Sequence, residues 1–209
     1  MKKTPLLPSL PSLTPTDFFL EDEMLFESAL LTDADYSYLT CRNLILRQSH
    51  LQKITLQKTR LEQLDCQQVV FEKCDFSNLE SFGGSFHRVH FKQCKLIGAN
   101  FADSYFRDCT FEDCLADFAS FSNGNFNYVT FTGCSLQDSE FYELTWKHLQ
   151  LAHNQLDNSN WFRTNLAQLD FCTNTFSKIA FSVEQLRGAI VNQEQALILA
   201  AGLGLQIEY

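Results

Sequence analysis

Large apolar residues recur at every fifth position of this chain, from Phe26 to Leu186. This register has 33 positions; none is charged, and 29 hold Phe, Leu, Tyr or Trp. It also contains 15 of the 20 Phe residues and both Trp residues. A period of five fits neither the 3.6-residue period of a helix nor the two-residue period of a flat strand. The pattern therefore predicts a repeat architecture.

A second column, of mostly small residues, lies two positions before the first. Ala, Gly, Ser, Thr, Cys or Val fill 20 of its 33 places, and Glu184 is its only charged member. Residues two apart on an extended chain point the same way, so each unit of five is predicted to be a short extended side followed by a corner. Such units wind a solenoid with a continuous core. Leucines in the small column predict local widening of the coils: Leu39, Leu44, Leu64, Leu79, Leu144, Leu149 and Leu169.

The spacing of the cysteines indicates how many sides make one coil. Cys74, Cys94, Cys114 and Cys134 are 20 residues apart in the small column, which favours four units per coil. The 33 units then make roughly eight coils. At a strand spacing of about 4.8 Å, eight coils form a rod about 40 Å long.

Several units also resemble the pentapeptide repeat, A-(D/N)-L-x-x. They are CDFSN at 74–78, ANFAD at 99–103, ASFSN at 119–123 and SNWFR at 159–163. The resemblance extends over residues 26–190 and implies an all-β fold, a right-handed quadrilateral β-helix. It agrees with the four sides inferred from the spacing.

Residues 1–25 precede the repeat and are predicted to form an N-terminal arm or cap. Lys2 and Lys3 begin it as in a secretory signal, but Pro5, Pro8 and Pro11 interrupt any apolar helix, so we expect a cytoplasmic protein. The acidic stretch 17–24 is predicted to form one helical turn or a cap. No apolar run approaches the length needed for a membrane-spanning helix.

Residues 191–209 follow the repeat and are apolar on nearly every face. Asn192 and Gln195 have capping-box spacing, which predicts a helix over 193–201 that ends at Gly202, followed by a short strand at 205–207. One face can cover the end of the solenoid. The surplus of apolar side chains predicts an end-to-end homodimer through Leu197, Ile198, Leu199, Leu203, Leu205 and Ile207.

The sequence offers little that is typical of an enzyme. Seven of the eight Cys occupy inward positions and are expected to be free thiols, while Cys172 points outward. The five His lack a third ligand at metal spacing, and the motifs for phosphate, nucleotide or nucleophile sites do not occur. We therefore expect no catalytic residues, no cofactor and no metal. A cavity beside His148 and His153 would reopen that question.

Charge is distributed unevenly around the predicted coil. The net charge of −9 argues against direct binding of nucleic acid. With 20 residues per coil, one side collects Glu62, Glu80, Asp103, Glu140 and Glu143. The adjoining side adds Asp75, Asp117, Asp138 and Asp157, together with Lys58, Lys95 and Lys178. Such a column is either a solvated face that keeps the rod soluble or a binding surface for a basic partner.

An uninterrupted pentapeptide solenoid with a helical, apolar C-terminal segment resembles the Qnr and MfpA type. That resemblance implies a dimeric DNA mimic that binds DNA gyrase or topoisomerase IV, inhibits it or protects it from quinolones. Two 40 Å rods would match roughly 24 base pairs at about 3.4 Å each. The alternative is an interaction scaffold with another partner. A contiguous acidic side would favour the mimic, and a fragmented one the scaffold.

Overall fold

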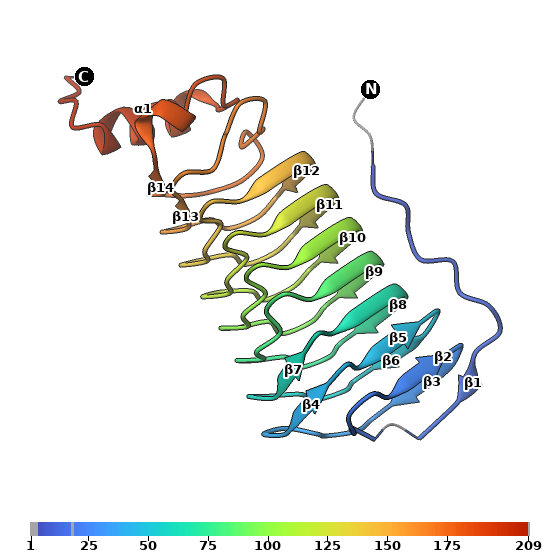
Figure 1. Ribbon diagram of the computed structural model, residues 1–209. Coiled ribbons are helices and arrows are strands. Elements are labelled where there is room, and N and C mark those ends of the chain that lie inside the picture. Colours follow the sequence, from blue (N-terminus) through green and yellow to red (C-terminus); the bar gives the residue numbers. More distant parts are fainter. Residues whose placement is uncertain (1–3, 18, 209) are drawn as a thin grey trace.

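The computed structural model describes residues 4–17 and 19–208 and is a β-solenoid of about eight coils with one short C-terminal helix (Figure 1). Strands in successive coils pair in parallel with partners 20 residues apart, such as Phe86↔Phe106 and Phe106↔Phe126. The predicted period, the four-sided coil and the all-β class are therefore confirmed.

The coil of residues 85–104 defines the four sides used below. The first side is 85–89, the second 90–94, the third 95–99 and the fourth 100–104, and equivalent residues in other coils differ by multiples of 20. Long strands run through the corner between the first and second sides. The third and fourth sides are joined mostly by isolated parallel bridges, for example Lys95↔Leu115 and Asn100↔Ser120.

The ten-stranded sheet on the first and second sides begins at the arm and ends at β12. Its strands are β1 (Thr14–Pro15), β2 (Leu25–Glu27), β3 (Ala29–Thr32), β5 (Ile45–Arg47), β6 (His50–Gln52), β8 (Asp65–Glu72), β9 (Ser85–Lys92), β10 (Tyr105–Glu112), β11 (Asn125–Thr132) and β12 (Thr145–Ala152). Two smaller sheets lie on the fourth side: β4 (Thr40–Arg42) with β7 (Arg60–Glu62), and β13 (Asn160–Trp161) with β14 (Ala180–Phe181). A 3-10 helix spans Val183–Gln185, and α1 spans Gln193–Gly202.

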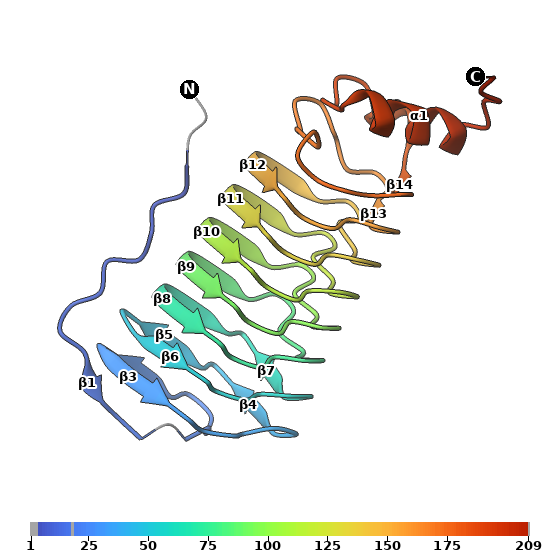
Figure 2. The same ribbon diagram turned by 180° about the vertical axis from the view of Figure 1, so that it is seen from behind.

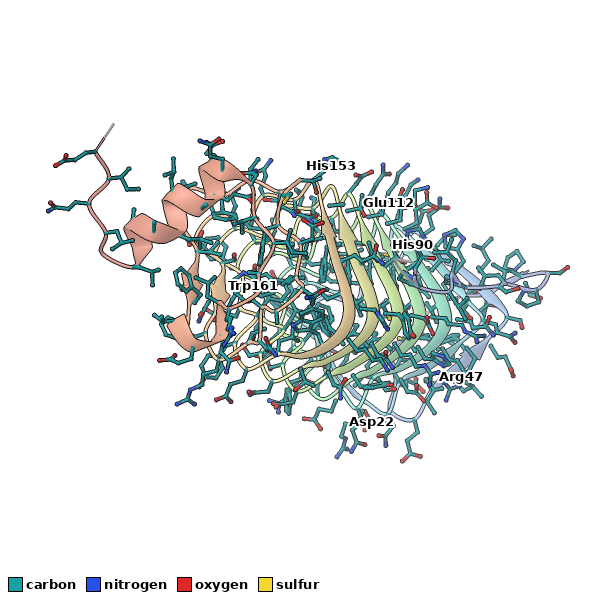
Figure 3. All side chains as sticks on the ribbon, turned by 90° about the horizontal axis from the view of Figure 1, so that it is seen from above. Asp22, Arg47, His90, Glu112, His153 and Trp161 are labelled. Carbon is teal, nitrogen blue, oxygen red and sulfur yellow. The ribbon has the colours of Figure 1, made fainter. Side chains whose placement is uncertain are left out.

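Both inward columns pack into one core. Phe86, Phe106 and Phe111 are fully buried. Rings in successive coils stack, with centroids 4.5 Å apart for Phe86 and Phe106 and 4.6 Å apart for Phe91 and Phe111. Viewed along the axis, Trp161 lies inside the ring of strands, whereas Arg47 and other charged side chains point outward (Figure 3).

Corners depend on residues in the left-handed conformation. Asp113 has φ 52° and Gly133 has φ 67°, and each donates its backbone N–H to the next coil, at 2.9 Å to Thr132 and 3.0 Å to Ala152. These hydrogen bonds offset the conformational cost of a positive φ. Gly84 instead fills a small inward position, where a Cβ would lie 2.8 Å from the Phe86 ring.

The N-terminal arm does more than cover the first coil. Residues 4–13, which precede the β1 strand that pairs with β3, run along the corner between the first and second sides (Figures 1 and 2). The N–H of Ser9 donates to Gln68 Oε1 at 3.2 Å, and the N–H of Leu6 donates to Asp108 Oδ1 at 3.1 Å. The described part of 17–24 contains no helical turn, so of the two predicted alternatives, a helical turn or a cap, the helical turn is wrong. This part forms a bend in which Asp22 pairs with Arg42 at 3.0 Å.

The C-terminal helix begins as predicted. The Asn192 side chain accepts from the Gln195 N–H at 2.9 Å, and the Gln195 side chain accepts from the Asn192 N–H at 3.1 Å. The strand expected at 205–207 is wrong, because this segment follows Gly204 at φ 83° and no neighbouring strand lies beside it among the described residues. None of the described helices is long and apolar enough to cross a membrane.

Candidate functional site

The five acidic residues singled out in the sequence all lie on the fourth side, but they differ in their partners. The Arg60 guanidinium forms ion pairs with two of these carboxylates. Its Nε lies 3.0 Å from Glu62 Oε1, and its Nη1 lies 3.8 Å from Glu80 Oε2. At the other end, Arg163 Nη1 lies 2.5 Å from Glu143 and lowers the pKa of that carboxyl. Both ends of the acidic side are therefore partly neutralised.

The middle of this side is different. Over residues 96–162, the third and fourth sides carry no Lys or Arg. Because these two sides share a corner, their acids form one surface, which we call the acidic patch: Asp103, Asp117, Asp138, Glu140 and Asp157. The 20-residue spacing already placed these acids on two adjoining sides, and the coil brings them together at a shared corner.

Neutral donors orient several of these carboxylates without removing their charge. Glu140 Oε2 accepts from Asn160 Nδ2 at 2.6 Å, one coil further on. Asp117 Oδ1 accepts from the Gln137 N–H at 3.0 Å, and Asp157 Oδ1 from the Ser177 N–H at 2.7 Å. Hydrogen bonds to charged acceptors are strong. Each of these bonds joins a carboxylate to a residue of the next coil, so the coils fix the positions of the carboxylates along the rod.

Exposed aromatic side chains border the acidic patch. Phe118 is 62% exposed on the third side, and Phe162 is 46% exposed on the fourth. Neither was singled out in the sequence, although both lie outside the five-residue register that explains 15 of the 20 Phe residues. Exposed aromatics next to oriented charges are typical of protein-binding surfaces.

The C-terminal segment separates into an inward and an outward set. Leu199 is buried against the core and Ile198 is partly buried, so both belong to the lid on the solenoid. Leu197, Leu203 and Leu205 are exposed, and Ile207 is half-buried. Only the outward set is available to a second protein.

Four of the inward cysteines, Cys74, Cys94, Cys114 and Cys134, form a column of thiols on the second side, and Cys109 lies on the first side. All eight Cys are free of disulfides, and seven are buried. Each thiol in the column donates to a backbone carbonyl of the preceding coil, as Cys94 does to Phe71 at 3.3 Å. Burial raises the pKa of Cys109 to about 12, so its thiol stays neutral.

A crevice does lie beside His148 and His153. It is made of two adjoining hollows, of about 380 Å3 and 780 Å3, along β12. The His148 ring stacks on Tyr128 with centroids 4.5 Å apart. Among residues 4–17 and 19–208, no three His, Cys, Asp or Glu side chains gather as metal ligands would.

Residues 84–161 match the family described as pentapeptide repeat region. No curated protein matches the chain. Among solved structures, a trypsin-treated variant of QnrB1, a plasmid-mediated fluoroquinolone resistance protein, has a TM-score of 0.52 at 14% identity, covering 94% of this chain and 100% of that chain. A second such variant has a TM-score of 0.46 at 17% identity, covering 85% and 100%. HetL, a pentapeptide repeat protein involved in heterocyst differentiation regulation in the cyanobacterium Nostoc sp. strain PCC 7120, has a TM-score of 0.32 at 13% identity, covering 81% and 85%.

Proposed function

This chain is a pentapeptide-repeat protein, and from that we propose that it acts by binding, without a reaction of its own, to a bacterial type II topoisomerase. The acidic patch takes the place of a DNA backbone on DNA gyrase or topoisomerase IV. Binding there inhibits the enzyme or protects it from quinolones.

The acidic patch is the observation that carries this proposal. On the third side Asp117, Asp138 and Asp157 recur once per coil, about 4.8 Å apart along a filled rod, and over residues 96–162 no base lies among the patch carboxylates on the third and fourth sides. A repeating line of negative charge attracts a groove built for phosphates and releases counterions when it binds there. Phe118 and Phe162 add apolar contact at the edges of the acidic patch.

A homodimer extends the same surface. Leu197, Leu203 and Leu205 expose apolar area at the C-terminal end, close to the coils that carry Glu140 and Asp157 (Figure 1). If two copies join there, their acidic patches flank the junction and form the central part of one rod. Leu203→Glu together with Leu205→Glu should convert the dimer to a monomer, as measured by light scattering after size-exclusion chromatography.

A scaffold for a different protein partner is the second candidate, favoured by the ion pairs at both ends of the acidic side. Arg60 and Arg163 interrupt the negative charge, and residues 26–187 carry a net charge of only −5, from 19 acids and 14 bases. A partner with a mixed surface would match this pattern better than a DNA-binding groove.

A gyrase supercoiling assay with and without ciprofloxacin tests the proposal. We expect the protein to inhibit supercoiling or to relieve the effect of the drug. Asp138→Asn with Glu140→Gln should remove most of that effect, because both changes fall in the acidic patch. The matched control, Glu62→Gln with Glu80→Gln, removes the same charge from carboxylates already paired with Arg60 and should retain it.

The outcomes separate the two candidates. No effect of the native protein at a large molar excess over gyrase and over topoisomerase IV would reject the topoisomerase proposal in favour of the scaffold. Equal loss in both double variants would show that overall charge, and not the acidic patch, is responsible.

A further inference from the structure

The N-terminal arm has a repeat of its own. Residues 5–13 read PLLPSLPSL, with a proline at every third position and a leucine two places after each proline. Three residues per turn is the repeat of polyproline II, an extended conformation without hydrogen bonds between its own backbone groups. The arm is therefore held against the rod only by contacts with the rod itself.

The arm runs along a line of three equivalent corner residues in successive coils. They are Gln68, Arg88 and Asp108, with φ of 55°, 54° and 55°. The outer two hold the arm, since Gln68 accepts from the Ser9 N–H and Asp108 from the Leu6 N–H. Three residues of polyproline II span about 9 Å, close to the roughly 10 Å between corners two coils apart. The arm and the corner therefore match in register.

The middle corner residue, Arg88, is poorly matched by the arm. Leu7 and Pro8 cross its coil, because they lie between the two bonded residues, and neither side chain can accept a hydrogen bond. In the part of the chain that the structure describes, Arg88 Nε is buried and has no hydrogen-bond partner. A buried donor without an acceptor is destabilising. This cost offsets part of what the two hydrogen bonds of the arm contribute.

The side chains of the arm hold it only lightly. Leu6 and Leu7 are 55% and 61% exposed, so they bury little apolar area. The base of the arm is firmer, because β1 pairs with β3 and the Thr14 N–H donates to the Ser28 carbonyl at 2.9 Å. Residues 4–13 are therefore free to lift from the corner while β1 keeps them tethered to the first coil.

Positive charge gathers around Arg88. Arg107 Nε lies 3.7 Å and His87 Nε2 lies 4.0 Å from Asp108 Oδ2. Burial and the nearby charges of Arg88 and Arg107 lower the pKa of His87, so both guanidinium groups lie close to its ring. Asp108 is the one acid in 85–92 and 105–108, so two guanidinium groups share a single carboxylate. This part of the corner favours an additional negative charge.

We propose that this corner binds an extended, acidic segment of a protein partner, and that the arm occupies the site until such a segment displaces it. The segment donates two backbone N–H groups, three residues apart, to Gln68 and Asp108, as the arm does. A carboxylate between those two groups accepts from Arg88, which is the contact that the arm lacks. A hydrogen bond from a guanidinium to a carboxylate is strong, so the acidic segment binds more tightly than the arm.

The site is independent of the topoisomerase proposal. It lies on the corner between the first and second sides, whereas the acidic patch lies on the third and fourth. The two surfaces also differ in charge, so a partner that recognises one does not fit the other. A displaced arm stays attached through β1 and returns to the corner when the partner leaves.

A pair of synthetic peptides tests the binding in the full-length protein. The probe is TPLLESLPSL, the sequence of residues 4–13 with glutamate in place of proline at position 8, and its matched control is TPLLASLPSL. Fluorescence anisotropy of labelled peptides should show about fivefold tighter binding of the glutamate peptide, the size expected for a partly exposed ion pair. At saturation this peptide should also speed hydrogen exchange in residues 4–13, because it displaces the arm.

Replacing the middle corner residue tests the site itself. Arg88→Met should abolish the difference between the two peptides. Lys147→Met, which removes a positive charge from the first side three coils further along, should preserve it. No binding of the glutamate peptide, equal affinity of the two peptides, or a preference that persists in Arg88→Met would overturn the proposal.

The free protein gives a second, independent readout. Because methionine needs no acceptor, Arg88→Met should remove the cost of covering the guanidinium and slow hydrogen exchange in residues 4–13 about fivefold. Faster exchange in this variant would mean that Arg88 holds the arm in place, so that the corner is already satisfied and the proposal is wrong.

Discussion

Replacing Phe106 by alanine tests the core that the five-residue register predicts. Phe106 has no exposed surface and contacts rings in its own coil and in both neighbouring coils. Its ring stacks on Phe86 at 4.5 Å and meets Phe126 edge-on at 5.0 Å. Removing it leaves a cavity bounded by rigid rings that cannot move inward without breaking their own stacks.

The expected loss follows from these contacts. Burial of a phenylalanine side chain contributes up to about 3 kcal/mol, and a cavity that does not collapse adds to the cost. We expect Phe106→Ala to reduce the free energy of unfolding by about 3–5 kcal/mol. Phe162→Ala, which removes the same ring from a position 46% exposed, should change it by less than about 0.5 kcal/mol.

Urea unfolding measures both variants. Far-UV circular dichroism follows the coils, and tryptophan fluorescence follows the C-terminal part, where Trp161 is buried. The two probes should give coincident transitions if the rod unfolds as one unit. A loss below about 1 kcal/mol for Phe106→Ala, or an equal loss for Phe162→Ala, would refute the assignment of inward and outward positions.

Three further predictions concern the thiols, an acid and the arm. At pH 8 a thiol reagent should label the half-buried Cys172 quickly and the seven buried thiols slowly. Burial keeps the reagent away from these thiols and, at Cys109, raises the pKa to about 12, so that little reactive thiolate is present. Fast labelling of most of the eight cysteines would contradict the packing. Burial alone would raise the pKa of Asp75, but hydrogen bonds from neighbouring side chains outweigh it and lower the pKa below 3.8. Stability should therefore fall as the pH drops through that lower value, and urea midpoints measured against pH should show a smaller fall in Asp75→Asn. Asp108→Ala removes the acceptor of the Leu6 N–H and should speed hydrogen exchange in the arm; unchanged exchange would mean that this contact does not hold it.

The repeat could be predicted because its signal is local and recurs in every coil. Each unit needs one large and one small inward side chain, and Phe106 and Cys109 satisfy this in the same way as their equivalents in other coils. The capping pair of Asn192 and Gln195 could be predicted for the same reason, since all of its atoms lie within four residues.

Other features depend on contacts that no local pattern encodes. The arm is fixed by a bond between Leu6 and Asp108, which are 102 residues apart. The crevice was not predictable because Leu166, Leu169 and Phe171 keep the inward register without a break, while the backbone changes from strand to turn. The 20-residue spacing puts Arg60 and Arg163 on the acidic side, but which carboxylates their guanidinium groups contact is decided by side-chain geometry that the sequence does not encode.

Competition between this protein and duplex DNA for purified gyrase tests the central claim most directly. With the protein labelled and the ionic strength fixed, the account predicts that unlabelled duplex displaces it, and that its affinity falls steeply as salt is raised. Asp138→Asn with Glu140→Gln should weaken binding, whereas Glu62→Gln with Glu80→Gln should not. Binding that saturating DNA leaves intact, or no binding to gyrase at all, would contradict DNA mimicry by the acidic patch.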